Sequence, residues 1–261
     1  MSTLLDNTER SERGRALQAE ALGQPEPAPQ TLMEESWRDF VFAEVWSQTA
    51  MPRRARYLVA MAGAVLTGAD ESLLDGLVRG ALSNGELSVV ELREAALHLG
   101  PYAGWGRGMA LDKAVTRTVQ SLGLKDEPTA PIRGAPWDPA ERDAEGAAEF
   151  LKVMTFGSGP PVVPYLQAIH NFVFGEMWSR RALDEPSRRW LTLVGVCDSM
   201  AEVPIKSHIH AAMASGNCKP DEMQEFVLQF AILHGWPKAS IVQGAVFEMI
   251  KKVEAGLPWN G

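Results

Sequence analysis

The chain contains an internal repeat, which restricts its possible folds more than any other feature. Residues 172–179, FVFGEMWS, repeat residues 40–47, FVFAEVWS, at an offset of 132 (172 minus 40). Further along, the offset becomes 131 (216 minus 85), so that Gly85 corresponds to Gly216 and Glu94 to Glu225. A solenoid needs at least three repeats. Two copies therefore predict a tandem pair of related domains.

Composition favours a soluble protein with a small-molecule partner. The 261 residues carry a formal net charge of −8, whereas a nucleic-acid surface needs a concentrated basic patch. Residues 1–30 have no apolar core of the signal-peptide type, and no run of about 18 apolar residues occurs. Cys197 and Cys218 are the two cysteines and form no C-x-x-C pair. We therefore expect no nucleic-acid partner, no membrane span and a cytoplasmic location.

The apolar residues follow a helical period in both copies. Trp37, Phe40, Val41 and Val45 are spaced as on one face of a helix, and residues 169–177 repeat that spacing. Local signals fix several helix ends: an acidic residue and proline at 184–186, a capping box at 88–91, and glycines at 85 and 216. No convincing strand alternation appears. The sequence predicts an all-α fold with about five or six helices per copy.

A proline-rich stretch separates the copies. Prolines stand at positions 128, 131, 136 and 139. We predict a first domain over residues 1–124, a linker over 125–139 and a second domain over 140–261.

Together these motifs resemble the carboxymuconolactone decarboxylase family, which includes the alkylhydroperoxidase-D type peroxidases. The resemblance rests on Glu-x-Trp-Ser, an arginine ten residues after that tryptophan, and an acidic helix that ends in YAGW (102–105) or HGWP (234–237). It occurs once in each copy, so that the two occurrences together cover nearly the whole chain. It implies an all-helical domain that dimerises, so a tandem chain would form an intrachain pseudo-dimer. It also implies sites near subunit contacts and a homotrimer containing six related domains.

Thiol chemistry does not fit this member of the family. The peroxidases need two cysteines, four and seven residues before a histidine, because peroxide reduction uses an attacking and a resolving thiol. Counting back from His208 gives Pro204 and Ala201. In the first copy the histidine position is Leu77. Acid–base chemistry is what remains.

The candidate residues are divided between the copies. We assign His208 as general acid, Arg188 as the clamp for carboxylate and lactone oxygens, and Glu176 as the group that orients one of them. The further candidates for substrate binding are Trp178, Trp236, His210, His234, His98 and Tyr102. His98 and Tyr102 are one helical turn apart, with Glu94 a turn before them. We expect one working kind of site.

Each candidate also has a structural interpretation. Glu44 and Glu176 could be buried partners of Arg56 and Arg188, and Trp178 could belong to the core. His98 with Tyr102 could be a packing pair at a helix end. His210 faces about 200° away from His208 on an ideal helix. The two cannot share one ion, so we expect no metal site.

The leading hypothesis is a cofactor-independent decarboxylase or isomerase. Its substrate would be a small lactone or a β-keto or enol carboxylic acid, which provides its own electron sink. The alternative is a non-catalytic scaffold or small-molecule-binding protein derived from the enzyme. A thiol peroxidase is the third and weakest hypothesis.

Overall fold

The computed structural model describes residues 5–132 and 138–261. Within these residues the chain forms helices and no strands, which confirms the predicted all-α class. The first half contains α1 (Asn7–Leu22), α2 (Leu32–Ser36), η1 (Trp37–Val45), α3 (Arg53–Thr67), α4 (Glu71–Ser83), α5 (Val89–Ala103) and α6 (Trp105–Ser121). The second half contains α7 (Pro139–Met154), α8 (Pro164–Ala168), η2 (Ile169–Trp178), α9 (Glu185–Asp198), α10 (Glu202–Ala214), α11 (Pro220–His234) and α12 (Trp236–Glu254). The starts of corresponding helices differ by 132 before α4 and by 131 from α4 onward, as the sequence offsets do.

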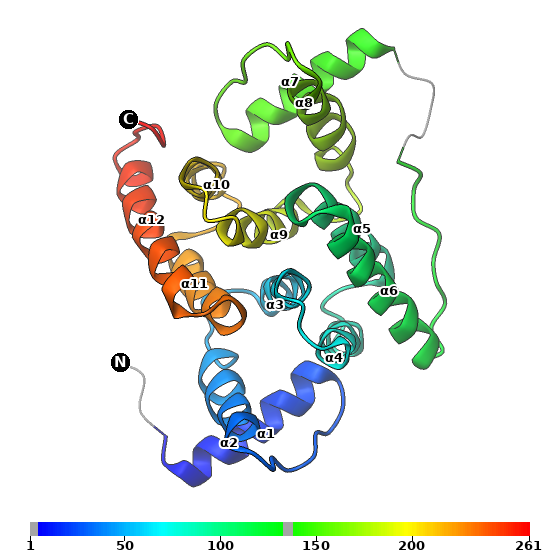
Figure 1. Ribbon diagram of the computed structural model, residues 1–261, viewed down its shortest axis with the longest axis vertical. Helices are drawn as coiled ribbons and strands as arrows, with labels where there is room; N and C mark the ends of the chain where they lie inside the picture. The colour runs from blue at the N-terminus through cyan, green and yellow to red at the C-terminus, as the bar shows by residue number, and fades with distance from the viewer. Residues whose placement is uncertain (1–4, 133–137) are drawn as a thin grey trace.

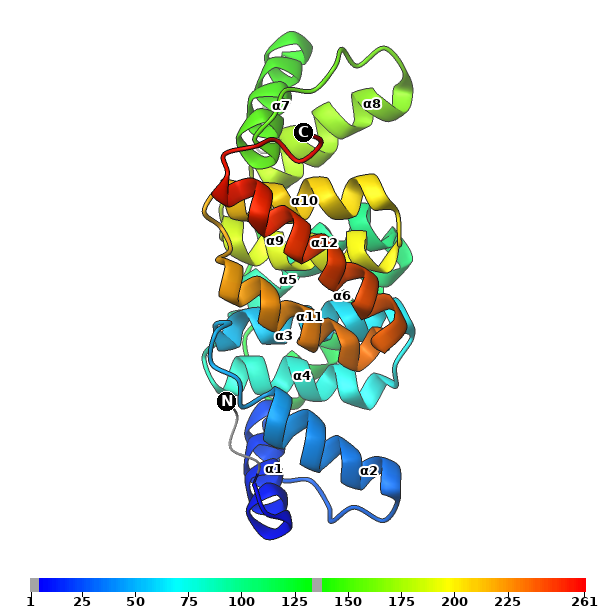
Figure 2. The same ribbon diagram turned by 90° about the vertical axis from the view of Figure 1, so that its left-hand side faces the viewer.

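The two halves interlock at the centre of the molecule. Helices α3 and α9 lie against each other, α3 also packs on α11, and α9 packs on α5 (Figure 1). Since α3 corresponds to α9 and α5 to α11, each contact between the halves has its counterpart. Figure 2 shows two arms at opposite ends of this centre, one with α1 and α2 and one with α7 and α8. This arrangement supports the pseudo-dimer that the resemblance implies.

Local sequence signals set the ends of the central helices. The side chain of Ser88 accepts a hydrogen bond from the backbone N–H of Glu91, and the Glu91 side chain accepts one from the backbone N–H of Ser88. This is the predicted capping box. Asp184 caps α9 by accepting from the Ser187 backbone. Gly85 and Gly216 follow α4 and α10 with φ of 67° and 77°, values that glycine adopts without a steric penalty. Short-range chemistry therefore explains why these helices begin and end where predicted.

The repeated FVF segment differs from the expected helix type. η1 and η2 are π-helices, although the apolar spacing predicted an α-helical period. π-Helical turns are rare and cannot be recognised from apolar spacing alone. In each arm the segment lies against a glycine of the arm's first helix, α1 or α7. A Cβ at Gly146 would come within 2.1 Å of the His170 carbonyl oxygen, and one at Gly14 within 2.4 Å of that of Arg38. The absence of a side chain at these glycines lets α1 pack closely on η1 and α7 on η2.

The boundary between the halves follows α6. α7 begins at Pro139, one residue before the predicted second domain, and Asp138 caps it. Pro136 of the predicted linker lies outside the described residues. Among the helices described, none combines the length and apolar character that crossing a bilayer requires.

Candidate active site

Two buried ion pairs join the halves, and each takes its arginine from one copy and its glutamate from the other. Arg188 Nη2 donates to Glu94 Oε2 at 2.9 Å, and Arg56 Nε donates to Glu225 Oε1 at 2.7 Å. All four side chains are no more than 6 % exposed. Glu94 also receives bonds from Arg180. Burial opposes ionisation of Glu94, but these arginines outweigh it, so the pKa of Glu94 is lowered.

The pairing predicted for the glutamates of the repeated segment is wrong. Glu176 pairs with Arg142 at 2.5 Å, and Glu44 pairs with Arg10 at 2.7 Å. These contacts hold α7 to η2 and α1 to η1 inside each arm. Glu176 therefore stabilises an arm and does not orient Arg188.

The hydrogen bonds of Arg188 fix the tautomer of His98. Arg188 Nη1 lies 3.3 Å from His98 Nδ1, and His98 Nε2 lies 2.9 Å from Thr192 Oγ1. A guanidinium only donates, so Nδ1 must accept and Nε2 must carry the hydrogen. Burial, followed by the charges of Arg188 and Arg189, holds the pKa of His98 well below its usual range. His98 is therefore a neutral donor to Thr192.

The same network continues to Tyr102. Trp178 Nε1 donates to the Tyr102 hydroxyl at 2.7 Å. Thr192 Oγ1 accepts from His98 and lies near enough to Tyr102 to affect its pKa. Because Trp178 donates to its oxygen, Tyr102 keeps its own proton for another acceptor. Burial raises the pKa of Tyr102, while the hydrogen bond from Trp178 and the nearby Thr192 act in the opposite direction.

His208 lies beside Tyr102, with the ring centroids 5.9 Å apart. Its Nδ1 is buried and has no hydrogen-bond partner among the described residues. Burial, and to a lesser degree the charge of Arg189, lowers the pKa of His208 to about 3. His208 is therefore neutral at pH 7. The acid role predicted for it needs an imidazolium that this environment disfavours.

Arg189 was not among the predicted site residues. Its side chain is 0 % exposed, and its guanidinium carbon lies 5.1 Å from the centre of the Trp178 ring. The signal was present in the sequence, because Arg189 stands where the first copy has Tyr57, at the usual offset of 132. We call the set of Glu94, His98, Tyr102, Trp178, Arg188, Arg189, Thr192 and His208 the central cluster. Tyr102 and His208 are its partly exposed members.

Besides Glu176, three predicted residues lie outside the central cluster. His210 Nε2 bonds to the Leu257 carbonyl at 2.8 Å. His234 Nδ1 bonds to Asp198 Oδ1 at 2.9 Å. Trp236 is 53 % exposed and contacts Phe40, so it is not a wall of this site.

The corresponding position in the other half is largely apolar. The equivalents of His98, Tyr102, Thr192 and His208 are Gln229, Leu233, Ala60 and Leu77. The ion pair and a tryptophan, Trp46, are retained there, and Glu225 accepts from the backbone of Ala50 and Met51. The acid–base groups are thus confined to one of two equivalent positions.

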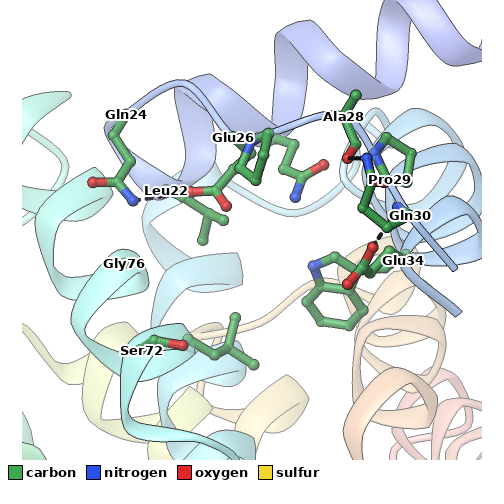
Figure 3. Close-up of a pocket in the computed structure, with 13 residues that line it drawn as sticks. Leu22, Gln24, Glu26, Ala28, Pro29, Gln30, Glu34, Ser72 and Gly76 are labelled. Atoms are coloured by element: carbon green, nitrogen blue, oxygen red, sulfur yellow. Dashed lines mark hydrogen bonds between the residues drawn. The ribbon is translucent and has the colours of Figure 1, made fainter.

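Other features do not provide a competing site. Both cysteines are buried, and burial raises the pKa of each thiol, which disfavours the reactive thiolate. In the described part of the chain, no group of three or more His, Cys, Asp or Glu side chains is arranged to hold a metal ion. A cavity of about 320 Å³ lies between α1, the loop after it and α4 (Figure 3). The two carboxylates of this cavity are already hydrogen-bonded within the protein: Glu26 accepts from Gln24, and Glu34 accepts from the backbone of Gln30 and Thr31.

Comparison with known proteins agrees with the motifs. The model of the carboxymuconolactone decarboxylase family matches residues 32–117. This part of the first half is therefore similar to the family. A 4-carboxymuconolactone decarboxylase of Acinetobacter baylyi is 33 % identical over 88 residues, which cover 34 % of the chain and 64 % of that relative. The chain thus matches less than two thirds of the relative's length. The family match includes Glu94, His98 and Tyr102, whereas the internal repeat carries the likeness into the second half.

Proposed function

We propose that the chain is a cofactor-independent lyase or isomerase that acts on a small lactone or a β-keto or enol carboxylic acid. The observation that carries the proposal is the Tyr102 hydroxyl, which accepts from the buried Trp178 and keeps its own proton beside the partly exposed His208. The name of the Acinetobacter relative supports a lactone acid as substrate.

Decarboxylation would use Tyr102 as the proton donor. Loss of carbon dioxide leaves an electron pair that spreads into the unsaturated lactone, and the Tyr102 hydroxyl then protonates the carbon. The resulting phenolate is stabilised by the hydrogen bond from Trp178, and Thr192 also favours the ionised form. Water restores the phenol, and the hydroxide formed combines with carbon dioxide to give bicarbonate. Arg188 acts indirectly, because its bond to His98 orients the donor to Thr192.

Isomerisation would use the same groups in a different order. A neutral His208 can remove a proton next to a carbonyl, and Tyr102 can return a proton at another carbon. The low pKa of His208 in the free protein makes it a weak base, although a bound carboxylate would raise that pKa. Product analysis separates the two reactions, because only decarboxylation releases carbon dioxide.

Proton NMR in deuterated buffer tests the proposal. Wild type, Tyr102→Phe and His210→Gln are incubated with 4-carboxymuconolactone and with related lactones and β-keto acids. We expect deuterium at one product carbon, retained in His210→Gln and lost in Tyr102→Phe. Full turnover by Tyr102→Phe would refute its role. No turnover of any compound by wild type would favour the non-catalytic binding protein.

The assembly of three chains also stays a proposal, which rests on the family resemblance. Sedimentation equilibrium of the intact chain measures it directly.

A further inference from the structure

Arg189 differs from the other arginines of the central cluster in the groups that it contacts. Its Nη2 donates to the Val153 carbonyl at 2.6 Å and to Asn217 Oδ1 at 3.2 Å, and its Nε donates to the same Asn217 oxygen at 3.3 Å. All these acceptors are neutral. No carboxylate of the described residues lies within 4 Å of its guanidinium, and its buried Nη1 has no hydrogen-bond partner among them.

This arrangement is costly for the protein alone. A buried charge is normally paired, as Arg188 is with Glu94, because removing an ion from water without compensation costs several kcal/mol. The fold does not need a charge at this position. The equivalent side chain in the first copy is Tyr57, also 0 % exposed, and it bonds through its hydroxyl to Asn84.

Arg189 lies near both Tyr102 and His208. Its guanidinium carbon is 5.1 Å from the centre of the Trp178 ring, and the Trp178 indole donates a hydrogen bond to the Tyr102 hydroxyl. The rings of Tyr102 and His208 have centroids 5.9 Å apart, and His208 Nδ1 has no partner among the described residues. The charge of Arg189 acts on the pKa of Tyr102 and of His208, the partly exposed members of the central cluster.

We propose that Arg189, rather than Arg188, binds the carboxylate of the substrate. Nη1 of Arg189 donates to one carboxylate oxygen, and the planar acid lies near the Trp178 ring, within reach of the Tyr102 proton. Arg188 has no part in this contact because Glu94, His98 and the Leu183 carbonyl already occupy its donors. The assignment of the anion as substrate rests on the proposed function, whereas binding of a carboxylate does not.

Thermal unfolding and titration calorimetry with benzoate test the inference without any turnover. Benzoate is a planar carboxylate, and benzamide is its neutral counterpart. We expect benzoate, but not benzamide, to raise the unfolding midpoint of wild type. Arg189→Met should weaken benzoate binding at least about tenfold, as expected for loss of a charge-assisted hydrogen bond. Arg13→Met, at an exposed arginine of α1, should bind benzoate as wild type does.

The unliganded variants provide a second readout. If Arg189 serves an anion, Arg189→Met removes an uncompensated buried charge and should unfold at or above the wild-type midpoint. A purely structural Arg189 would give a clearly lower midpoint together with unchanged benzoate affinity, which would overturn the inference. Arg189→Gln replaces the methionine variant if the latter does not fold.

Failure of the inference and failure of the proposed function give different results. Benzoate that leaves the wild-type midpoint unchanged overturns the carboxylate site, whatever the turnover experiments show. Benzoate binding that depends on Arg189, in a protein that turns over no lactone or β-keto acid, keeps the site and rejects the reaction. Unchanged lactone turnover and KM in Arg189→Met would keep the reaction and reject the site.

Discussion

The buried, unpartnered Nδ1 of His208 predicts a specific dependence of stability on pH. Its pKa is about 3 in the folded protein, whereas a solvent-exposed histidine of the unfolded chain has a pKa of about 6.5. Between these values the unfolded state binds the additional proton. The stability associated with neutral His208 is therefore fully present above pH 6.5 and is lost as the pH falls toward 3.

The size of the effect follows from the two pKa values. Proton linkage gives a loss of about 2 kcal/mol between pH 7 and pH 5 for this single group. His208→Gln removes the group, so this part of the loss should disappear. The free energy of unfolding of wild type minus that of the variant should fall by about 2 kcal/mol over this interval, because the other titrating groups are common to both proteins.

Urea unfolding of both proteins at pH 8, 7, 6 and 5 measures this difference. Between pH 7 and pH 8 it should be nearly constant, which provides an internal control. A difference that does not change down to pH 5 would mean that His208 is hydrated or paired in solution. It would then be available as an imidazolium acid, and the assignment of the acid role to Tyr102 would lose its main support.

The central cluster and its apolar counterpart give three further predictions. Tyr102→Phe should lower turnover at least about 100-fold and destabilise by about 1–3 kcal/mol, since the buried Trp178 N–H loses its acceptor; steady-state kinetics and urea unfolding measure these effects. Arg56→Met should lower the free energy of unfolding in urea by about 3–5 kcal/mol, because it leaves the buried Glu225 without an arginine. Arg188→Met should lower it less, because Glu94 keeps its bond to Arg180. Equal losses would contradict this. Gly195→Ala should lower turnover because its Cβ would lie 2.8 Å from the Tyr102 carbonyl oxygen, whereas Gly63→Ala meets a leucine side chain in the other half and should retain activity.

The sequence was informative where short-range chemistry decides the structure. The ends of α4, α5 and α9 follow from Gly85, the Ser88–Glu91 capping box and Asp184. Each signal lies within a few residues of the helix end that it sets. The internal repeat then extended the helix pattern of one copy to the other.

Side-chain partners were predicted less well because they depend on packing between the copies. An ion pair between Glu176 and Arg188 was considered because each residue has an equivalent in the first copy. The partner of Arg188 is instead Glu94, 94 residues away on the other copy, and Glu176 pairs with Arg142. Arg189 was overlooked because its difference from Tyr57 does not by itself indicate a function. Its burial and its unpartnered Nη1 appear only in the folded protein.

The exchange of partners between copies also explains how one chain can contain one polar and one apolar site. The central cluster takes α5 from the first copy and η2, α9 and α10 from the second, whereas its counterpart takes α11 from the second copy and the end of η1, α3 and α4 from the first. Leu233 and Leu77 therefore alter the counterpart without changing a residue of the central cluster. In a homodimer of a single-copy chain, every substitution would enter both sites at once. Duplication removes this constraint, while the Arg56–Glu225 pair, which also binds the backbone at Met51, preserves the packing between the halves.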